Sequence, residues 1–127
     1  MPYVFSQAAN PLAIAECEYA SAAEIRFSSF TSCIGIVGIR NGEVFGIHLP
    51  LAVDDFVTNA DIDAALVHCQ GLAQTTITGV IGAWTSSRPT VYAYLVAQLG
   101  NPAIGVDHDE GVYGARVNNG NLVLSYP

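Results

Sequence analysis

The stretch that decides the fold spans residues 31–49 and reads TSCIGIVGIR-NG-EVFGIHL. Two segments rich in β-branched and other apolar residues flank Asn41-Gly42, and this arrangement is the strongest short-range signal for a β-hairpin. Pro50 follows directly and ends the second segment, because proline cannot donate a hydrogen bond to a strand ladder. We therefore predict two antiparallel strands, over residues 31–40 and 43–49.

The register of this hairpin brings two reactive side chains together. A two-residue loop places Arg40 opposite Glu43 and therefore Gly35 opposite His48. Cys33 lies two residues before Gly35, so it is expected to project from the same face. Cys33 and His48 would then be diagonal cross-strand neighbours, with Cβ atoms roughly 7 Å apart. Because Gly35 has no side chain, the space between them should be open. A four-residue loop would keep this register, whereas a three-residue loop would break it.

A thiol beside an imidazole can form a thiolate–imidazolium pair, which lowers the pKa of the cysteine and activates it as a nucleophile. We therefore predict that Cys33 is a nucleophile and that His48 is its general base. The sequence offers no identifiable acidic residue to orient His48, which leaves a backbone carbonyl or a serine hydroxyl for that role. The competing interpretation is a buried structural cysteine and a histidine at a strand end.

The same hairpin resembles the core of a known family. The segments TSCIGI and GIHLP are similar to those of the chemoreceptor glutamine deamidases (the CheD family), which pair a cysteine strand with a downstream His-Leu-Pro setting. The cytotoxic necrotizing factors and Burkholderia lethal factor, which are deamidating toxins of related fold, have the same Cys–His arrangement. The resemblance covers most of the chain in element order, but at the level of motifs it is confined to the hairpin.

The resemblance implies a protein-glutamine deamidase, a hydrolase that acts on the carbon–nitrogen bond of a linear amide. Cys33 would attack the side-chain amide of a glutamine, and backbone N–H groups near Ser32 and Cys33 would stabilise the oxyanion. His48 would protonate the departing ammonia and then activate water. The reaction needs no cofactor and no metal. The residues predicted to support the site are Ser29, Thr31, Ser32 and Gly35.

The match has one departure, and other functions stay open. The chemoreceptor deamidases carry a threonine six residues before the nucleophile, where this chain has Phe27; Ser28, Ser29 or Thr31 could replace it, and the necrotizing factors lack that threonine. A cysteine peptidase or a transglutaminase-like acyl transferase would use the same pair. In a non-enzymatic protein-interaction module, or in a purely structural domain, neither Cys33 nor His48 would have a catalytic role.

Length, composition and net charge limit which of these functions and partners are possible. The chain has 127 residues, which fit one domain over 1–127, and 51% of them are apolar, enough for a sizeable core. No apolar run approaches the length of a membrane span, and no secretory signal is visible, so we expect a soluble protein. The net charge of −7 disfavours binding to nucleic acid or to an anionic membrane. The expected partner is a substrate protein bearing a reactive glutamine, and the expected state is a monomer.

Two residue counts bear on location. The three cysteines lack a CxxC pair, which argues against a disulfide framework and fits a reducing compartment. The chain contains no lysine, through compositional bias or because a bacterial effector inside a eukaryotic cell thereby avoids ubiquitin attachment. The expected location is the bacterial cytoplasm, or the host cytosol after delivery without a cleaved signal.

The remaining pattern predicts an α+β fold: a mainly antiparallel or mixed β-sheet sandwich with two principal flanking helices, of the CheD-like deamidase type that the resemblance implies. The first helix should cover residues 60–72, capped by Thr58 or Asn59. The second should begin at a Ser86 or Ser87 cap, with Pro89 in its first turn, and end at Gly100. Strands are expected over residues 23–27, 76–84, 103–107, 112–117 and 122–126, and a helix is conceivable over 11–23. The cluster Asp107-His108-Asp109-Glu110 is interpreted as a solvated turn rather than a metal site.

Overall fold

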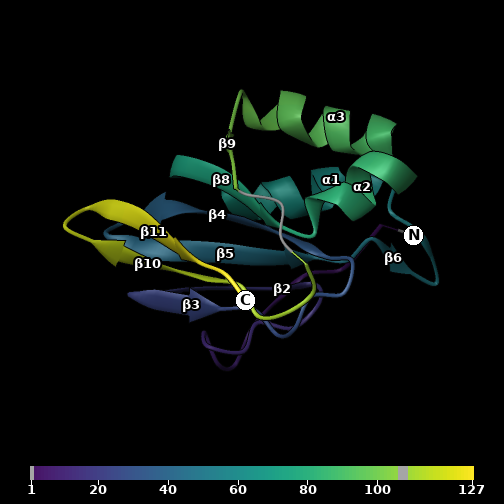
Figure 1. Cartoon of the computed structure of the whole chain (residues 1–127). Helices are drawn as coiled ribbons and strands as arrows, with labels where there is room; N and C mark the ends of the chain where they lie inside the picture. Colours follow the sequence, from purple (N-terminus) through teal and green to yellow (C-terminus); the bar gives the residue numbers. More distant parts are fainter. Residues whose placement is uncertain (1, 106–108) are drawn as a thin grey trace.

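The computed structural model describes residues 2–105 and 109–127, and its architecture has three layers (Figure 1). Helices cover one face of a six-stranded sheet, and a three-stranded sheet packs against the other face. The class is therefore α+β, as the sequence predicts. The helices are α1 (Asn59–Leu66) with the 3-10 turn η1 (Val67–Cys69), α2 (Ile81–Ser87) and α3 (Pro89–Leu99).

The large sheet is mixed and has the order β1-β2-β5-β4-β8-β9. The two outer pairs, β1 with β2 and β8 with β9, are parallel, and the inner pairs are antiparallel. In chain order its strands are β1 (Ser6–Gln7), β2 (Glu18–Ala22), β4 (Ile34–Arg40), β5 (Glu43–Leu49), β8 (Ala73–Gly79) and β9 (Ala103–Ile104).

The small sheet is antiparallel and has the order β11-β10-β3. Its strands are β3 (Glu24–Arg26), β10 (Gly114–Asn118) and β11 (Asn121–Ser125). A separate two-stranded ribbon joins β6 (Ala52–Val53) to β7 (Asp55–Phe56).

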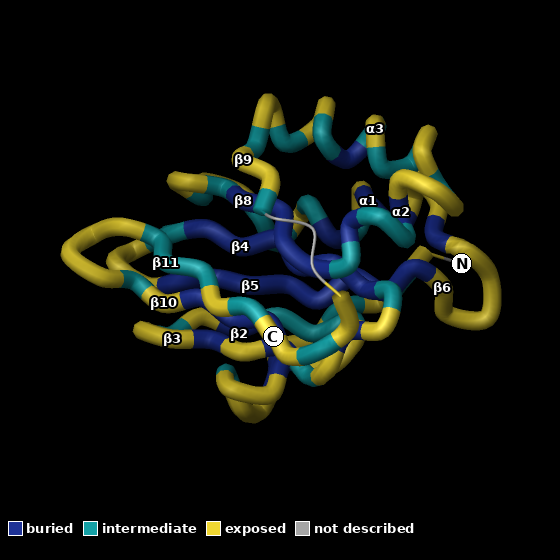
Figure 2. The backbone as a smooth tube through the Cα atoms, viewed as in Figure 1, coloured by how far each residue is buried: buried dark blue, intermediate teal, exposed yellow. Residues whose placement is uncertain are grey.

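The predicted hairpin forms β4 and β5 at the centre of the large sheet, and its register is confirmed: Arg40 pairs with Glu43 and Gly35 pairs with His48. Both strands are almost entirely buried, as the dark blue centre of Figure 2 shows. Burial on both faces follows from the three layers, because Ile36 packs with the helices while Val37 packs with the small sheet.

Several predicted boundaries are wrong. The strand expected over 76–84 stops at Gly79, whose φ of +123° is unfavourable for other residues, and α2 follows from Ile81. Ser86 and Ser87 lie inside α2, and Arg88 is the N-cap of α3. Within residues 2–105 and 109–127, three α-helices therefore flank the sheet instead of two.

Other boundaries agree with the sequence. Thr58 is the N-cap of α1, Pro89 opens α3, and Gly100 ends it with a left-handed φ of 71°. Other expectations are wrong: residues 11–23 contain β2 and turns rather than a helix, and α1 ends at Leu66, with η1 reaching only Cys69, instead of residue 72. Strand 103–107 is observed only as β9, and its last two residues lie outside the described part of the chain. Within the described residues, no helix has both the length and the apolar character needed to cross a bilayer.

Candidate active site

His48 sits near the end of β5 with its ring completely buried. Its Nδ1 lies 2.8 Å from the carbonyl oxygen of Ile14, and because a carbonyl can only accept, Nδ1 must carry the proton. The Nε2 atom therefore presents a lone pair, and it is buried without a hydrogen-bond partner among the residues that the structure describes. A backbone carbonyl thus orients His48, one of the two possibilities that the sequence leaves open.

The segment around Ile14 is tied to both sheets. The Ile14 carbonyl also accepts from the Ser28 N–H at 2.9 Å, beside a bridge between Ile14 and Phe27. Three residues later, the Cys17 N–H donates to the His48 carbonyl at 3.0 Å. The segment therefore contacts His48 through both its ring and its backbone, and it carries Glu16 alongside.

Two aromatic rings enclose the imidazole. The Phe27 and Phe30 ring centroids lie 5.7 Å and 4.6 Å from that of His48. The expected open space above Gly35 is absent, because a Cβ at Gly35 would lie 2.7 Å from two Phe27 ring atoms. The glycine is required to admit the Phe27 ring. Burial among these rings lowers the pKa of His48, against the opposing effect of the Ile14 carbonyl, so the ring is neutral.

Cys33 immediately precedes β4 and packs in the apolar cluster between the two sheets, the cluster that also contains Phe27 and Phe30. It is 2% exposed, and its Sγ donates to Oε1 of Glu16 at 3.6 Å. Burial, followed by the charge of Glu16 and its hydrogen bond, raises the pKa of Cys33 to about 12, against the backbone N–H groups of Ser32 and Leu51.

These contacts correct one prediction from the sequence. A thiolate–imidazolium pair is not present: Sγ bonds to Glu16, and no hydrogen bond joins Cys33 to His48 among the described residues. The physical reason is desolvation, which raises the pKa of the thiol and lowers that of the imidazole, so that both groups are neutral.

Glu16 covers the buried Cys33 thiol from the solvent side. Glu16 is exposed, yet its carboxylate accepts a hydrogen bond from a sulfur that is almost completely buried. Glu16 also lines a hollow of about 440 Å³, together with Tyr3, Cys17 and Asp54. The side chain of Glu16 therefore contacts both this hollow and Sγ.

The predicted supporting residues fall into two groups. Ser32 is half-buried, and its carbonyl accepts from Nε1 of Trp84 at 2.9 Å, which fixes the backbone next to Cys33. Gly35 lies opposite His48 as predicted. Ser29 and Thr31 are exposed, and no hydrogen bond links them to Cys33 or His48 in the described structure.

Sequence reasoning missed Ile14, Glu16 and Phe30. Ile14 contacts His48 through its backbone carbonyl and Phe30 through its ring. No sequence motif marks either residue for this contact. Glu16 lies in residues 11–23, where the sequence pattern is compatible with a helix, and only the tertiary fold brings it to Cys33.

Other candidate groups add no second site. All three cysteines are free thiols. Among the described residues, no group of three or more histidine, cysteine, aspartate or glutamate side chains is arranged to hold a metal ion. In the acidic cluster, Asp107 and His108 lie outside the described residues, so its interpretation as a solvated turn is untested there.

Comparison of the chain with known protein families, with curated proteins and with solved structures found no match.

Proposed function

We propose that this protein is a protein-glutamine deamidase in which Cys33 is the nucleophile and His48 the general base, on the deamidase-like fold that the hairpin motif resembles. The observation that carries the proposal is the orphaned Nε2 of His48. A buried nitrogen without a partner is costly, and a catalytic role is one physical reason for a protein to keep such a group. The Ile14 carbonyl fixes the tautomer that leaves Nε2 basic.

Three further features support the pair. Cys33 packs in the apolar cluster on the sheet face from which His48 projects, next to the rings of Phe27 and Phe30 that enclose the imidazole. The backbone N–H groups of Ser32 and Leu51 stabilise negative charge on Sγ. The Trp84 hydrogen bond fixes the carbonyl of the Ser32–Cys33 peptide group, and therefore the backbone beside the nucleophile.

In the proposed reaction, Sγ leaves Glu16 and transfers its proton to Nε2 of His48 as it attacks the amide carbon of a glutamine. The carbon–nitrogen bond then breaks, and ammonia departs with that proton. Water, deprotonated by His48, attacks the thioester carbon and restores the thiol, leaving glutamate. Because both groups start neutral, the proton moves during attack and a preformed thiolate is not needed.

The resting structure is closed, and the proposal includes its opening. In this opening, the Glu16 side chain rotates toward the adjacent hollow and gives up its hydrogen bond with Sγ. Binding of a glutamine amide in place of the Glu16 carboxylate is therefore part of the proposed mechanism.

The test is conversion of glutamine to glutamate in proteins of bacterial and eukaryotic lysates, followed by peptide mass spectrometry. Each conversion replaces NH₂ by OH and adds about 1 Da without cleavage or cross-link, which separates deamidation from peptidase or transferase activity. Cys33→Ser, which keeps only a weak nucleophile, should slow the conversion severely, and Cys69→Ser, which alters another free thiol, should retain it. Equal conversion by the wild type and Cys33→Ser would refute the proposal.

A second candidate is a non-enzymatic interaction module on the same fold. The burial and neutrality of Cys33 and His48 favour it, since a structural pair needs neither access nor charge. It predicts no glutamine conversion by the wild type.

A further inference from the structure

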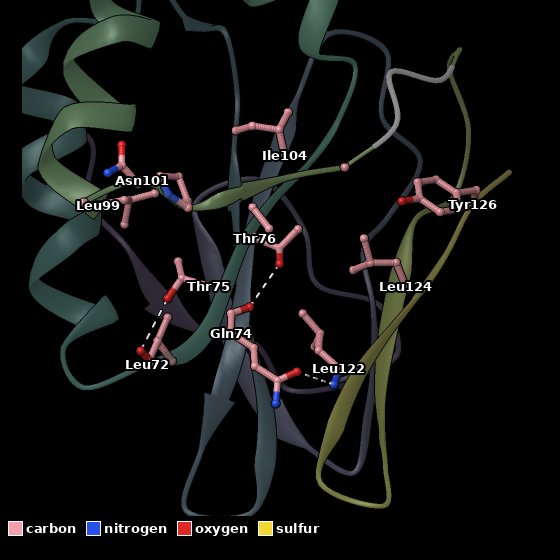
Figure 3. Close-up of a pocket in the computed structure, with 14 residues that line it drawn as sticks. Leu72, Gln74, Thr75, Thr76, Leu99, Asn101, Ile104, Leu122, Leu124 and Tyr126 are labelled. Atoms are coloured by element: carbon pink, nitrogen blue, oxygen red, sulfur yellow. Dashed lines mark hydrogen bonds between the residues drawn. The ribbon is translucent and has the colours of Figure 1, made fainter.

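A groove of about 750 Å³ lies on the side of the molecule where both sheets end (Figure 3). Thr76 of β8, Ile104 of β9, and Leu122 and Leu124 of β11 line it. In the sheet orders, β9 is the last strand of the large sheet and β11 is the last strand of the small one. The groove thus lies between two strand edges.

On this side of the molecule the small sheet ends two strands before the large sheet does. Its outer strand β11 packs over β4, whereas the large sheet continues from β4 to β8 and β9. Thr76 pairs with Val37 and shares its face, the face that the small sheet covers at Val37. A fourth strand beside β11 would lie over β8, where the groove is.

A glutamine side chain already pairs with β11 as a strand would. Oε1 of Gln74 accepts from the Leu122 N–H at 2.9 Å, and Nε2 of Gln74 donates to the Gly120 carbonyl at 3.0 Å. One amide thus donates and accepts along the outer edge of β11, the pattern of a neighbouring peptide group. Gln74 has a left-handed φ of 53° at this point.

The outer edge of β11 extends beyond the part that is hydrogen-bonded to Gln74. Since outward-pointing groups recur every second residue of a strand, the N–H and C=O of Leu124 point to the same side as the Leu122 N–H. That side faces the groove, in which Leu124 and Tyr126 form one wall (Figure 3).

We propose that this groove binds an extended, uncharged peptide segment of another protein, which adds to β11 as a fourth strand and pairs with Leu124. None of the described residues that line the groove is charged, so a charged side chain would lose hydration there without gaining a partner. Leu122, Leu124 and Ile104 offer apolar contact to alternate side chains of the added strand, while the backbone supplies the hydrogen bonds. This inference does not depend on the deamidase proposal.

The experiment uses the full chain, with the capped hexapeptide acetyl-Thr-Val-Thr-Val-Thr-Val-amide as the probe. At millimolar peptide we expect shifts of the Leu124 amide resonance in ¹H–¹⁵N NMR spectra and slower hydrogen exchange of that amide. The same peptide N-methylated at alternate amides keeps its side chains but cannot pair, and it should not bind. This control leaves the protein unchanged, so folding defects cannot affect it.

A pair of variants tests the edge itself. Leu124→Pro removes the outward N–H and should weaken peptide binding about tenfold. Leu124→Ile keeps the N–H and much of the side chain, and it should change binding by no more than about twofold. The number and dispersion of amide signals report whether each variant is folded.

Three results would overturn the inference. The first is no shift at Leu124 at millimolar peptide, and the second is equal binding of the N-methylated peptide. The third is a Leu124 amide that is protected before peptide is added in a concentration-dependent dimer, which would show that a second copy of this chain occupies the edge.

Discussion

Replacing Glu16 by glutamine should make the Cys33 thiol more reactive. With a pKa of about 12, about one thiol in 10⁵ is ionised at pH 7. A carboxylate 3.6 Å from Sγ opposes ionisation by roughly 1 kcal/mol in a water-like dielectric, the appropriate choice because Glu16 is exposed. Glutamine keeps the size of the cover but removes this charge, which raises the thiolate population about sevenfold. Because nucleophilicity falls with pKa, the alkylation rate should rise about threefold.

The assay is the rate of iodoacetamide labelling at Cys33, measured by peptide mass spectrometry at pH 7, with Cys17 and Cys69 as internal references. Glu18→Gln is the matched control, because Glu18 is two residues away and bonds to the Ala15 N–H instead of the thiol. It should leave the Cys33 rate unchanged. Equal rates in Glu16→Gln and the wild type, or a slower rate in the variant, would refute the assignment of Glu16 as the cover of this thiol.

Three further predictions concern folding and the site. Since the folded pKa of His48 lies below its ordinary value of 6.5, the unfolded chain binds the proton more readily, and stability should fall as pH drops below 6.5; chemical denaturation of His48→Asn should show a weaker fall. Gly35→Ala should cost about 1–3 kcal/mol by displacing the Phe27 ring, and Phe27→Leu should recover part of this loss in a double-mutant cycle of urea unfolding. Trp84→Phe should cost about 1–3 kcal/mol in the same assay, because it leaves the Ser32 carbonyl without its donor; a loss no larger than that of an exposed substitution would contradict this role.

The central hairpin could be predicted because its determinants are local. Asn41-Gly42 sets the turn, the turn sets the register, and the register puts Gly35 opposite His48. The class of fold and the ends of α3 also follow from local signals, namely Pro89 at the start and Gly100 at the end.

The environment of the site could not be predicted, because distant segments create it. The Phe27 ring fills the space above Gly35, and the Ile14 carbonyl and the Glu16 carboxylate arrive from an irregular segment without a periodic pattern. The pKa values follow from this burial, so an argument from the hairpin alone predicted an ion pair where the fold holds two neutral groups.

The boundary between β8 and α2 shows a similar failure. Residues 76–84 are mostly β-branched or apolar and contain no charged residue, and a short buried helix cannot be separated from a strand by such a run. Gly79 marks the change, because its backbone conformation ends the strand, and Trp84 then turns inward from α2 to bond with Ser32.

The most direct test of the Cys–His assignment is a double-mutant cycle on the rate of glutamine-to-glutamate conversion. The variants are Cys33→Ser, His48→Asn and the combination of the two. If the two residues act in one step, the double variant should be no slower than the slower single variant. Conversion at the wild-type rate in His48→Asn, or multiplicative losses in the double variant, would contradict the proposed pair.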